Sequence, residues 1–406
     1  MDNISILDQI INNQKAEEVA NLDAVMIINN LFGELSDRER DVLIRRHGLH
    51  GDTKETLESI GSAHNLTRER IRQIETSSVK KLQSLDNLDE YVSGLKKVIY
   101  QLMEEHGGLM EKEYLLELLV SFSASNINTE DENRDKHKNY LNFLITKLLH
   151  QEFEEVNNLK HFKESYKLKH QTLEHMEELA EELLNGIKEA KKIHTTENII
   201  KFITELESYD KHKEKLNREN TIDISHVLGS EHFTEAADLV NDNKPLYSML
   251  KAFRRIEQNN FGHWGINNWR EIKPKTINDK IYLVLKHSGK PMHFSKIADR
   301  INEVSFDNKI ANAATVHNEL ILDGKYVLVG RGLYGLKDWG YKSGNVLDVI
   351  EEILEEAGGP LTRDELIDRV LKRRLVKKAT IILALMNKDK FSKIDGRYFV
   401  SKKENM

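Results

Sequence analysis

The sequence of 406 residues contains no cysteine and only 4 prolines. Without cysteine the chain forms no disulfide, no thiolate zinc site and no cysteine nucleophile, a composition that fits the reducing cytoplasm. The scarcity of proline leaves few breaks in helices. No apolar run approaches the roughly 18 residues that a membrane span requires, and the acidic, polar start differs from the basic start of a signal peptide. We therefore expect a cytoplasmic protein without a membrane partner.

Charge is distributed unevenly along the chain. The net charge of −7 argues against a protein that simply coats nucleic acid. Residues 62–83, however, hold five Lys and Arg against two Glu, and residues 361–406 hold thirteen Lys and Arg against six Asp and Glu. Residues 104–182 are strongly acidic. Local basic segments on an acidic chain favour site-directed DNA binding over bulk binding.

Capping signals predict three successive helices before residue 84. Ser36, followed three residues later by Glu39, forms a capping box and predicts a helix from that point. Residues 56–64 predict a short helix, and Thr67 is the expected N-cap of a longer helix that ends near Gln83.

At 100° per residue, the helix that follows Thr67 has two distinct faces. One arc of about 80° is expected to pack inward and holds Ile71, Ile74, Ser78 and Leu82. The outward arc carries side chains that can read base edges, since Arg pairs with guanine, Gln with adenine, and Glu accepts from cytosine. These side chains lie in the first two turns, where a helix-turn-helix reader enters the major groove.

The preceding residues strengthen this interpretation. A short helix with a central Gly61, a tight turn and a capped polar helix follow the order of a helix-turn-helix. The alternative is an ordinary amphipathic surface helix with charge pairs between adjacent turns. We predict a DNA-binding surface that consists of Thr67, Arg68, Glu69, Arg70, Arg72, Gln73, Thr76, Lys80 and Lys81.

A weak internal repeat follows, in which three helices precede a β-hairpin, the plan of a winged helix. We therefore predict a mainly α fold, with a helix-turn-helix domain followed by tandem winged-helix domains. Polar residues 121–138 and 207–223 are expected as loops or linkers. The predicted parts are an N-terminal helical segment (1–34), the helix-turn-helix (35–86), winged helices at 91–168, 275–341 and 345–402, and a degenerate helical or winged-helix region (172–273).

Other signals are less specific. "GRGLYG" (330–335) satisfies a glycine-rich nucleotide motif, but strand-like sequence follows it, so we interpret it as the turn of a wing. Arg331 at this turn is a candidate contact to phosphate or the minor groove, and a solvated turn is the alternative. Basic residues 372–378 are a candidate contact to the DNA backbone or a solubilising loop. His47 and His50 are expected as a solvent-exposed pair.

The acid pairs along residues 104–182 are expected on solvated helix faces. The sequence contains no P-loop, H-E-x-x-H or G-x-S-x-G motif. We therefore expect no catalytic residue, no metal, no cofactor and no enzymatic activity.

Residues 35–83, with "TLESIG", "TRERIRQIE" and "KKL", resemble region 4 of the sigma-70 family of bacterial RNA polymerase sigma factors. In that family this helix reads the promoter −35 element. The resemblance implies base contacts from Arg68, Glu69 and Gln73, backbone or mixed contacts from Arg70 and Arg72, and peripheral contacts from Lys80 and Lys81.

The same resemblance implies that the helix from Ser36 to about Arg46 contacts the β flap of the RNA polymerase core. Its apolar residues would form that contact or belong to the core, and we favour the core; they are Leu35, Val42 and Leu43, with Phe32 before them. Only 34 residues, with a single aromatic, precede region 4. A complete sigma factor carries an aromatic-rich domain there, so we expect this chain to lack the family's means of opening a promoter.

"KPMHFSKIADRI" (290–301) and "GLYGLKDWGY" (332–341) resemble the HARE-type winged helix, also found in the delta subunit of some bacterial RNA polymerases. Both resemblances imply a sequence-specific, sigma-like transcription factor of bacterial type, with promoter-like double-stranded DNA and RNA polymerase as partners. Two alternatives remain open, both with weak non-specific DNA binding: a polymerase-associated interaction protein, and a DNA-defence or modification-sensing adaptor.

Overall fold

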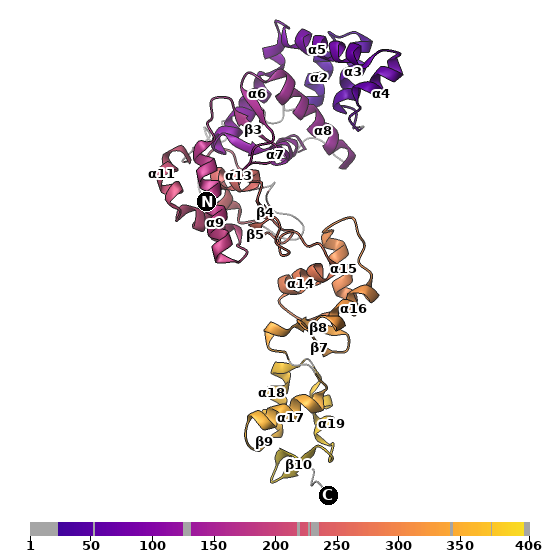
Figure 1. Cartoon of the computed structure of the whole chain (residues 1–406), viewed down its shortest axis with the longest axis vertical. Coiled ribbons are helices and arrows are strands. Elements are labelled where there is room, and N and C mark those ends of the chain that lie inside the picture. The colour runs from indigo at the N-terminus through magenta and orange to yellow at the C-terminus, as the bar shows by residue number, and fades with distance from the viewer. Residues whose placement is uncertain are drawn as a thin grey trace, which may run out of the picture. The chain divides into compact units, whose positions relative to one another are not determined.

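The computed structural model describes residues 23–51, 53–124, 131–216, 220–225, 228, 235–341, 344–374 and 376–401. The chain divides into two units, Met1–Asn267 and Asn268–Met406. Helices make up most of both units and the strands form small sheets (Figure 1), so the predicted mainly α class is confirmed. The helix predicted within residues 1–22 lies outside the described residues.

The first unit begins with the predicted helices. They are α2 (Ala24–Phe32), α3 (Asp37–His47), α4 (Leu57–His64) and α5 (Arg68–Gln83). The capping box before α3 is present, because the Ser36 amide donates to the Glu39 carboxylate at 2.9 Å and the Glu39 amide donates to the Ser36 hydroxyl at 3.5 Å. Thr67 caps α5 by accepting from the Arg70 amide at 3.2 Å. These predicted helix starts are confirmed.

The inward face of α5 is the one that the helical phase predicts. Ile71, Ile74, Ser78 and Leu82 are all buried. Ile71 and Ile74 pack with Val42 of α3 and Ile60 of α4 in one small core. Burial of this apolar stripe holds α5 against the two preceding helices and leaves its other face in solvent.

The next part of the chain packs directly on these helices. Its elements are α6 (Leu88–Glu105), β1 (Leu109–Glu111), α7 (Lys112–Ala124), α8 (Asp131–Phe143), the π-helical turn Leu144–Leu148, β2 (Phe153–Val156) and β3 (Ser165–Leu168). The Phe143 ring lies edge-on to Phe32, with ring centroids 6.0 Å apart. The Gln83 side-chain amide donates to the Lys147 carbonyl at 2.7 Å. The helix-turn-helix therefore shares an apolar and hydrogen-bonded interface with the segment that follows it.

The first unit ends in a bundle of five helices and a hairpin. These are α9 (Glu174–Ala190), α10 (Thr196–Thr204), α11 (Glu207–Leu216), α12 (Ala237–Asp242), α13 (Lys244–Ala252), β4 (Ile256–Gln258) and β5 (Trp264–Ile266). Lys244 and Glu105 form a buried ion pair at 2.6 Å. Glu105 also accepts from the Thr221 and Ile222 amides at 3.1 Å. These bonds satisfy charges that would be costly to bury alone.

The second unit holds two consecutive sets of similar elements. The first set is α14 (Ile277–Ser288), β6 (Met292–His293), α15 (Phe294–Val304), α16 (Ala313–Leu322), β7 (Tyr326–Gly330), β8 (Leu333–Leu336) and the 3-10 turn η3 (Lys337–Trp339). The second set is α17 (Val346–Glu356), β9 (Leu361–Thr362), α18 (Arg363–Arg373), α19 (Lys378–Leu385), β10 (Phe391–Ile394) and β11 (Arg397–Val400). The capping box of Thr362 and Glu365 at the start of α18 is present.

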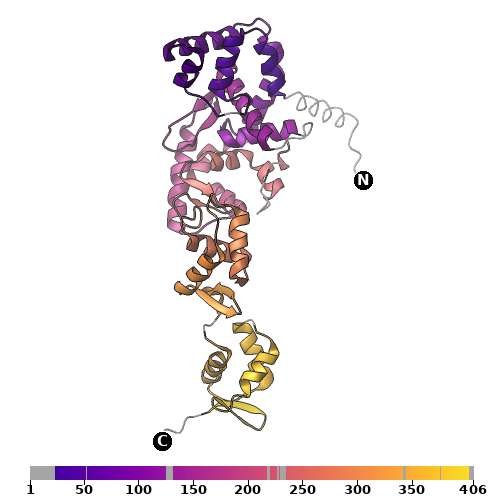
Figure 2. The ribbon, with the colours of Figure 1, turned by 90° about the vertical axis from the view of Figure 1, so that its right-hand side faces the viewer.

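Among the described residues, three small sheets share one topology; Figures 1 and 2 draw their strands as arrows. In each, a short strand after the first helix pairs antiparallel with the second strand of the hairpin, as β1 with β3, β6 with β8 and β9 with β11. The predicted helices and hairpins are present, but these short strands of two or three residues were not predicted. The sheets are compatible with winged-helix domains.

The two polar stretches contain helices, so the prediction of loops was wrong for most of their described residues. α7 reaches Ala124, α8 starts at Asp131, and α11 spans Glu207–Leu216. Their polar side chains pair with neighbouring helices: Arg134 lies 2.6 Å from Glu117, and Lys211 lies 2.8 Å from Glu178. Residues 125–130 and 217–219 lie outside the described residues.

Two further predictions need correction. Glu105 is buried, although we expected the acidic residues of this region on solvated faces. The His47 side chain is only 13% exposed, although we expected an exposed histidine pair. Its ring lies edge-on to Phe143 at 4.9 Å and contacts Glu75 at 3.4 Å. The burial of Glu105 and His47 was not predicted because the residues that they contact are distant in sequence. Among the described helices, none has the length and apolarity that crossing a bilayer requires.

Candidate nucleic-acid interface

The turn between α4 and α5 depends on a glycine. Asn65 ends α4 in the left-handed region with φ of 55°, and the Leu66 amide donates to the Gly61 carbonyl at 2.9 Å. A Cβ atom on Gly61 would lie 2.7 Å from the Leu66 carbonyl oxygen. The chain can therefore turn this closely back to Thr67 because residue 61 has no side chain.

The structure brings the predicted DNA-binding residues of α5 onto one exposed surface. Thr67, Arg68, Glu69, Arg70, Arg72, Gln73, Thr76, Lys80 and Lys81 are all exposed. The first seven belong to the N-cap and the first two and a half turns, and the two lysines lie in the last turn. The N-terminal turn also presents backbone N–H groups, which favour a phosphate contact.

Ion pairs connect several of these side chains. Arg72 donates two hydrogen bonds to the Glu69 carboxylate, at 2.9 and 2.7 Å. Arg68 donates to Glu58 of α4 at 3.0 Å, and Arg70 donates to the Gln73 side-chain carbonyl at 3.1 Å. Because the charged partners are more than half exposed, these ion pairs stabilise the fold little and DNA can replace them.

Glu69 stays ionised on this surface. The hydrogen bonds from Arg72 lower the pKa of the Glu69 carboxyl below its usual value, and they outweigh the opposing effect of desolvation. An ionised carboxylate is an acceptor for a cytosine amino group. It also repels phosphate, so this carboxylate is poorly suited to a contact with the DNA backbone.

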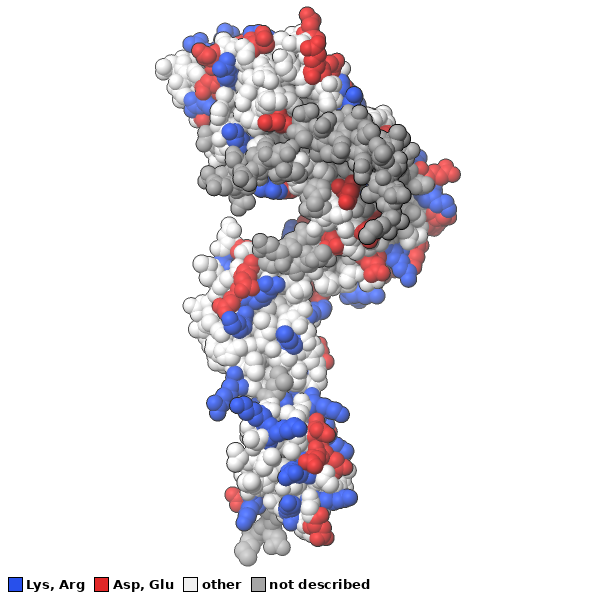
Figure 3. Space-filling model, turned by 180° about the vertical axis from the view of Figure 1, so that it is seen from behind, with Lys and Arg blue, Asp and Glu red and all other residues white. Residues whose placement is uncertain are grey.

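The last turn of α5 has a different character. Lys81 lies 3.7 Å from Glu39, and Lys80 has no ion pair within the described part of the chain. At the top of Figure 3, basic and acidic side chains are mixed over the N-terminal helices. The exposed surface of α5 therefore carries charges of both signs, from Arg68, Arg72 and Glu69, and is not uniformly basic.

The apolar residues predicted for polymerase contact are buried. Phe32, Leu35, Val42 and Leu43 are between 0% and 5% exposed. They could contact a partner only by unpacking, so their burial favours the assignment to the core over a polymerase contact.

The remaining candidates lie in the second unit. Arg331 is exposed at the turn between β7 and β8, with Gly332 at φ of 68° beside it. A strand follows this turn, so the glycine motif forms a wing and lacks the helix of a nucleotide site. Residues 372–378 lie at the end of α18 and the start of α19, and residue 375 lies outside the described residues. Figure 3 shows many basic side chains over this last set of elements, with acidic ones among them.

Together, α4, the Gly61 turn and α5 define a helix-turn-helix. Residues 31–84, which contain it, match the family model described as Sigma-70, region 4. The match covers this segment alone.

Curated relatives match over the same short length. The RNA polymerase sigma factor SigA of Microcystis aeruginosa is 47% identical over 68 residues, which cover 16% of this chain and 16% of SigA. RpoS of Coxiella burnetii is 40% identical over 70 residues, or 17% and 20% of the two chains. RpoD of Helicobacter pylori is 48% identical over 58 residues, or 14% and 9%. The chain thus spans a small part of the relatives it matches, and no solved structure matches it significantly.

Proposed function

We propose that this chain is a sequence-specific DNA-binding transcription protein that reads a promoter-like site with α5. The observation that carries the proposal is the exposed face of α5. It presents Arg68, Glu69 and Gln73 in the first two turns, while the opposite face of the helix is buried in the core. The segment is similar to sigma-70 region 4. No catalytic group, metal or cofactor is part of the proposal.

In this mechanism the N-terminal half of α5 enters the major groove. Arg68 replaces its hydrogen bond to Glu58 with one to a base edge. Arg72 replaces its hydrogen bonds to Glu69 with bonds to a phosphate or a base. The freed Glu69 carboxylate and the Gln73 amide then face base edges. Lys80 and Lys81, in the last turn, contribute contacts to the DNA backbone that carry no sequence information.

The same proposal includes a contact with RNA polymerase, because the relatives are named as RNA polymerase sigma factors. In this chain the contact would use the exposed polar side of α3, where Asp37 and Arg38 lie in solvent. The buried Val42 and Leu43 would instead hold that surface in place.

A second candidate function, protein interaction, concerns residues 275–341, which we propose to form a HARE-type winged helix. Its third helix, α16, contains no Lys or Arg, and its end exposes Ile321 and Leu322, which are 61% and 80% exposed. A helix with exposed apolar side chains and no basic residue suits a protein partner better than a DNA groove. This observation favours a polymerase-associated role for the second unit alongside DNA reading by the first.

DNA-site selection with the intact chain, with and without core RNA polymerase, tests the proposal. We expect one sequence motif to be enriched by the wild-type chain and lost with the triple variant Arg68→Ala, Glu69→Ala, Gln73→Ala. If polymerase co-purifies equally with both proteins and neither enriches a motif, the helix-turn-helix is a docking module and base reading is excluded.

A further inference from the structure

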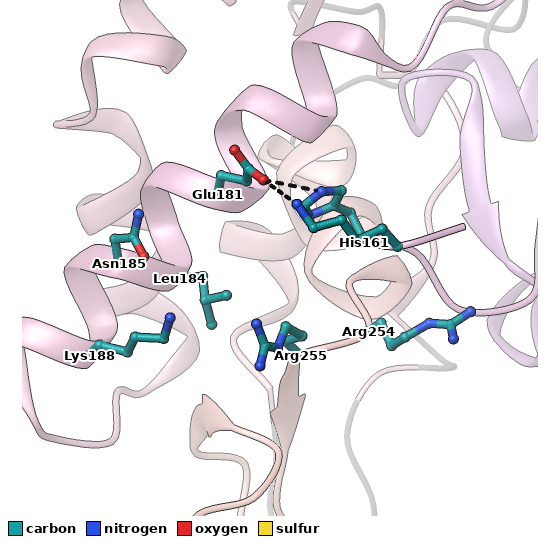
Figure 4. Close-up of a pocket in the computed structure, with 8 residues that line it drawn as sticks. His161, Glu181, Leu184, Asn185, Lys188, Arg254 and Arg255 are labelled. Carbon is teal, nitrogen blue, oxygen red and sulfur yellow. Dashed lines mark hydrogen bonds and ion pairs between the residues drawn. The ribbon is translucent and has the colours of Figure 1, made fainter. Parts of the chain in front are cut away.

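A basic cavity lies in the first unit, and the helix-turn-helix takes no part in it. Its volume is about 380 Å³, and one wall is formed by α9 (Figure 4). Four Lys or Arg side chains and His161 line it, against a single carboxylate, Glu181, among the described residues. Such an excess of positive charge around a recess favours an anionic ligand.

The wall that faces α9 is built from two segments distant in sequence. The loop between β2 and β3 joins the segment between α13 and β4 through a bridge between Phe162 and Phe253. The Lys163 amide donates to the Ala252 carbonyl at 2.8 Å, and the Arg254 amide donates to the His161 carbonyl at 2.8 Å. These backbone bonds fix Lys160 and His161 beside the two consecutive arginines.

The basic side chains of the cavity fall into two groups. Lys160 lies 2.8 Å and His161 lies 3.4 Å from Glu181, as the dashed lines in Figure 4 show. Lys188 and Arg255 have no side-chain ion pair with any described residue. In Figure 4 they lie on facing sides of the cavity near Leu184. Arg254 points away from them and donates through Nε to the Phe162 carbonyl at 2.9 Å.

We infer that this cavity binds the phosphate group of a small phosphorylated molecule, held between Lys188 and Arg255. A guanidinium supplies paired N–H donors to phosphate oxygens, and a lysine ammonium adds a mobile positive charge. The volume lies in the range of small-ligand sites. Glu181 screens Lys160 and His161, so the free charge is concentrated on the opposite side of the recess.

The position of the cavity separates it from the DNA-reading helix. Figures 1 and 2 both place α9 and α5 at opposite ends of the first unit. A DNA segment that is read by α5 therefore does not need this recess, which favours a small ligand over the DNA backbone. The inference does not depend on the proposed function of α5.

Isothermal titration of the intact chain with inorganic pyrophosphate and with ATP tests the inference. We expect both probes to bind, and the double variant Lys188→Gln, Arg255→Gln to weaken them by about tenfold or more. The variant Glu181→Gln should bind more tightly, because it removes the carboxylate of the cavity. The matched control Lys97→Gln, Lys215→Gln changes total charge equally at two exposed lysines outside the cavity and should leave binding unchanged.

A DNA arm distinguishes the two sources of phosphate. The same variants are titrated with a short duplex of random sequence, and circular dichroism confirms their helical content. Loss of pyrophosphate binding with unchanged duplex binding supports the inference. The inference is overturned if neither pyrophosphate nor ATP binds at millimolar concentration. It is also overturned if the control pair weakens their binding as much as the cavity double variant does. A loss confined to duplex binding also overturns it and assigns the cavity to the DNA backbone.

Discussion

Arg72 and Glu69 form a two-bonded ion pair on the exposed face of α5, with Nε–Oε2 and Nη2–Oε1 distances of 2.9 and 2.7 Å. Both residues were predicted to contact DNA, and each occupies the hydrogen-bonding groups of the other in the free chain. Base reading by Glu69 therefore requires that Arg72 move, and DNA phosphates are suitable replacement partners for its guanidinium. The two side chains should act as a coupled unit.

The substitution Glu69→Gln tests this coupling. It frees Arg72 and removes a negative charge that faces DNA, so affinity for random duplex should rise. Preference at one base pair of the selected site should fall by about tenfold, because an amide is a different partner for cytosine than a carboxylate. Fluorescence anisotropy with the selected duplex and its single-base variants measures both effects. Unchanged preference would make Glu69 only a partner of Arg72.

Substitutions of Arg68 and Lys80 should have different effects on DNA binding. Arg68→Ala should cost about 1–3 kcal/mol on the selected site and relax preference at a single position. Lys80→Ala should weaken all duplexes alike and reduce the slope of log affinity against log salt by about one. Titrations of both variants over a range of salt concentrations separate the two effects. If Arg68→Ala behaved like Lys80→Ala, the groove assignment would be wrong.

The features of α5 were predictable because they are local. Helical phase alone identified Ile71 and Leu82 as inward, and the hydroxyl of Thr67 directly before the helix identified its cap. The helix–hairpin plan followed from short-range patterns in the same way. The helical class of the fold and the orientation of the main surface therefore needed no tertiary information.

Long-range partners were not predictable. Nothing near Phe143 indicates that it packs on Phe32, more than a hundred residues earlier. The two segments were therefore predicted as separate domains, although they share an interface. The polar sequence of α8 was predicted as a loop because its ion-pair partners lie on another helix. Arg134 of α8 pairs with Glu117 of α7. Glu58 was missed as the partner of Arg68 because it lies on the neighbouring helix.

Gly61 and Gly94 provide a matched test of the turn. Both lie within helices, but a Cβ on Gly61 would lie 2.7 Å from the Leu66 carbonyl, whereas Gly94 has no neighbour within 4 Å. Gly94→Ala should stabilise the chain by about 0.5–1 kcal/mol, because alanine restricts the unfolded state. Gly61→Ala should destabilise it by about 1–3 kcal/mol through overcrowding and should also weaken DNA binding. Urea unfolding measures both, and equal effects would refute the close approach.

His106 should make the stability of the first unit depend on pH. The ring is fully buried, and its Nδ1–H donates to the Leu102 carbonyl at 2.6 Å. Burial lowers the pKa of His106 from 6.5 to about 4. Between these values the unfolded chain binds a proton that the folded chain does not, so the free energy of unfolding falls as pH falls. The slope from this residue is up to about 1.4 kcal/mol per pH unit, and it vanishes above 6.5 and below 4.

The variant His106→Gln isolates this contribution. Urea unfolding, followed by circular dichroism at several pH values on both sides of 6.5, gives the stability difference between wild type and variant. The variant should be less stable at neutral pH, because a fitted and hydrogen-bonded ring is lost, and the difference should shrink as the solution is acidified. The exposed His50, changed to Gln in the same way, serves as the control for the loss of an imidazole at the surface. A stability difference that stays constant with pH would show that the buried ring takes up its proton as readily as the unfolded chain does.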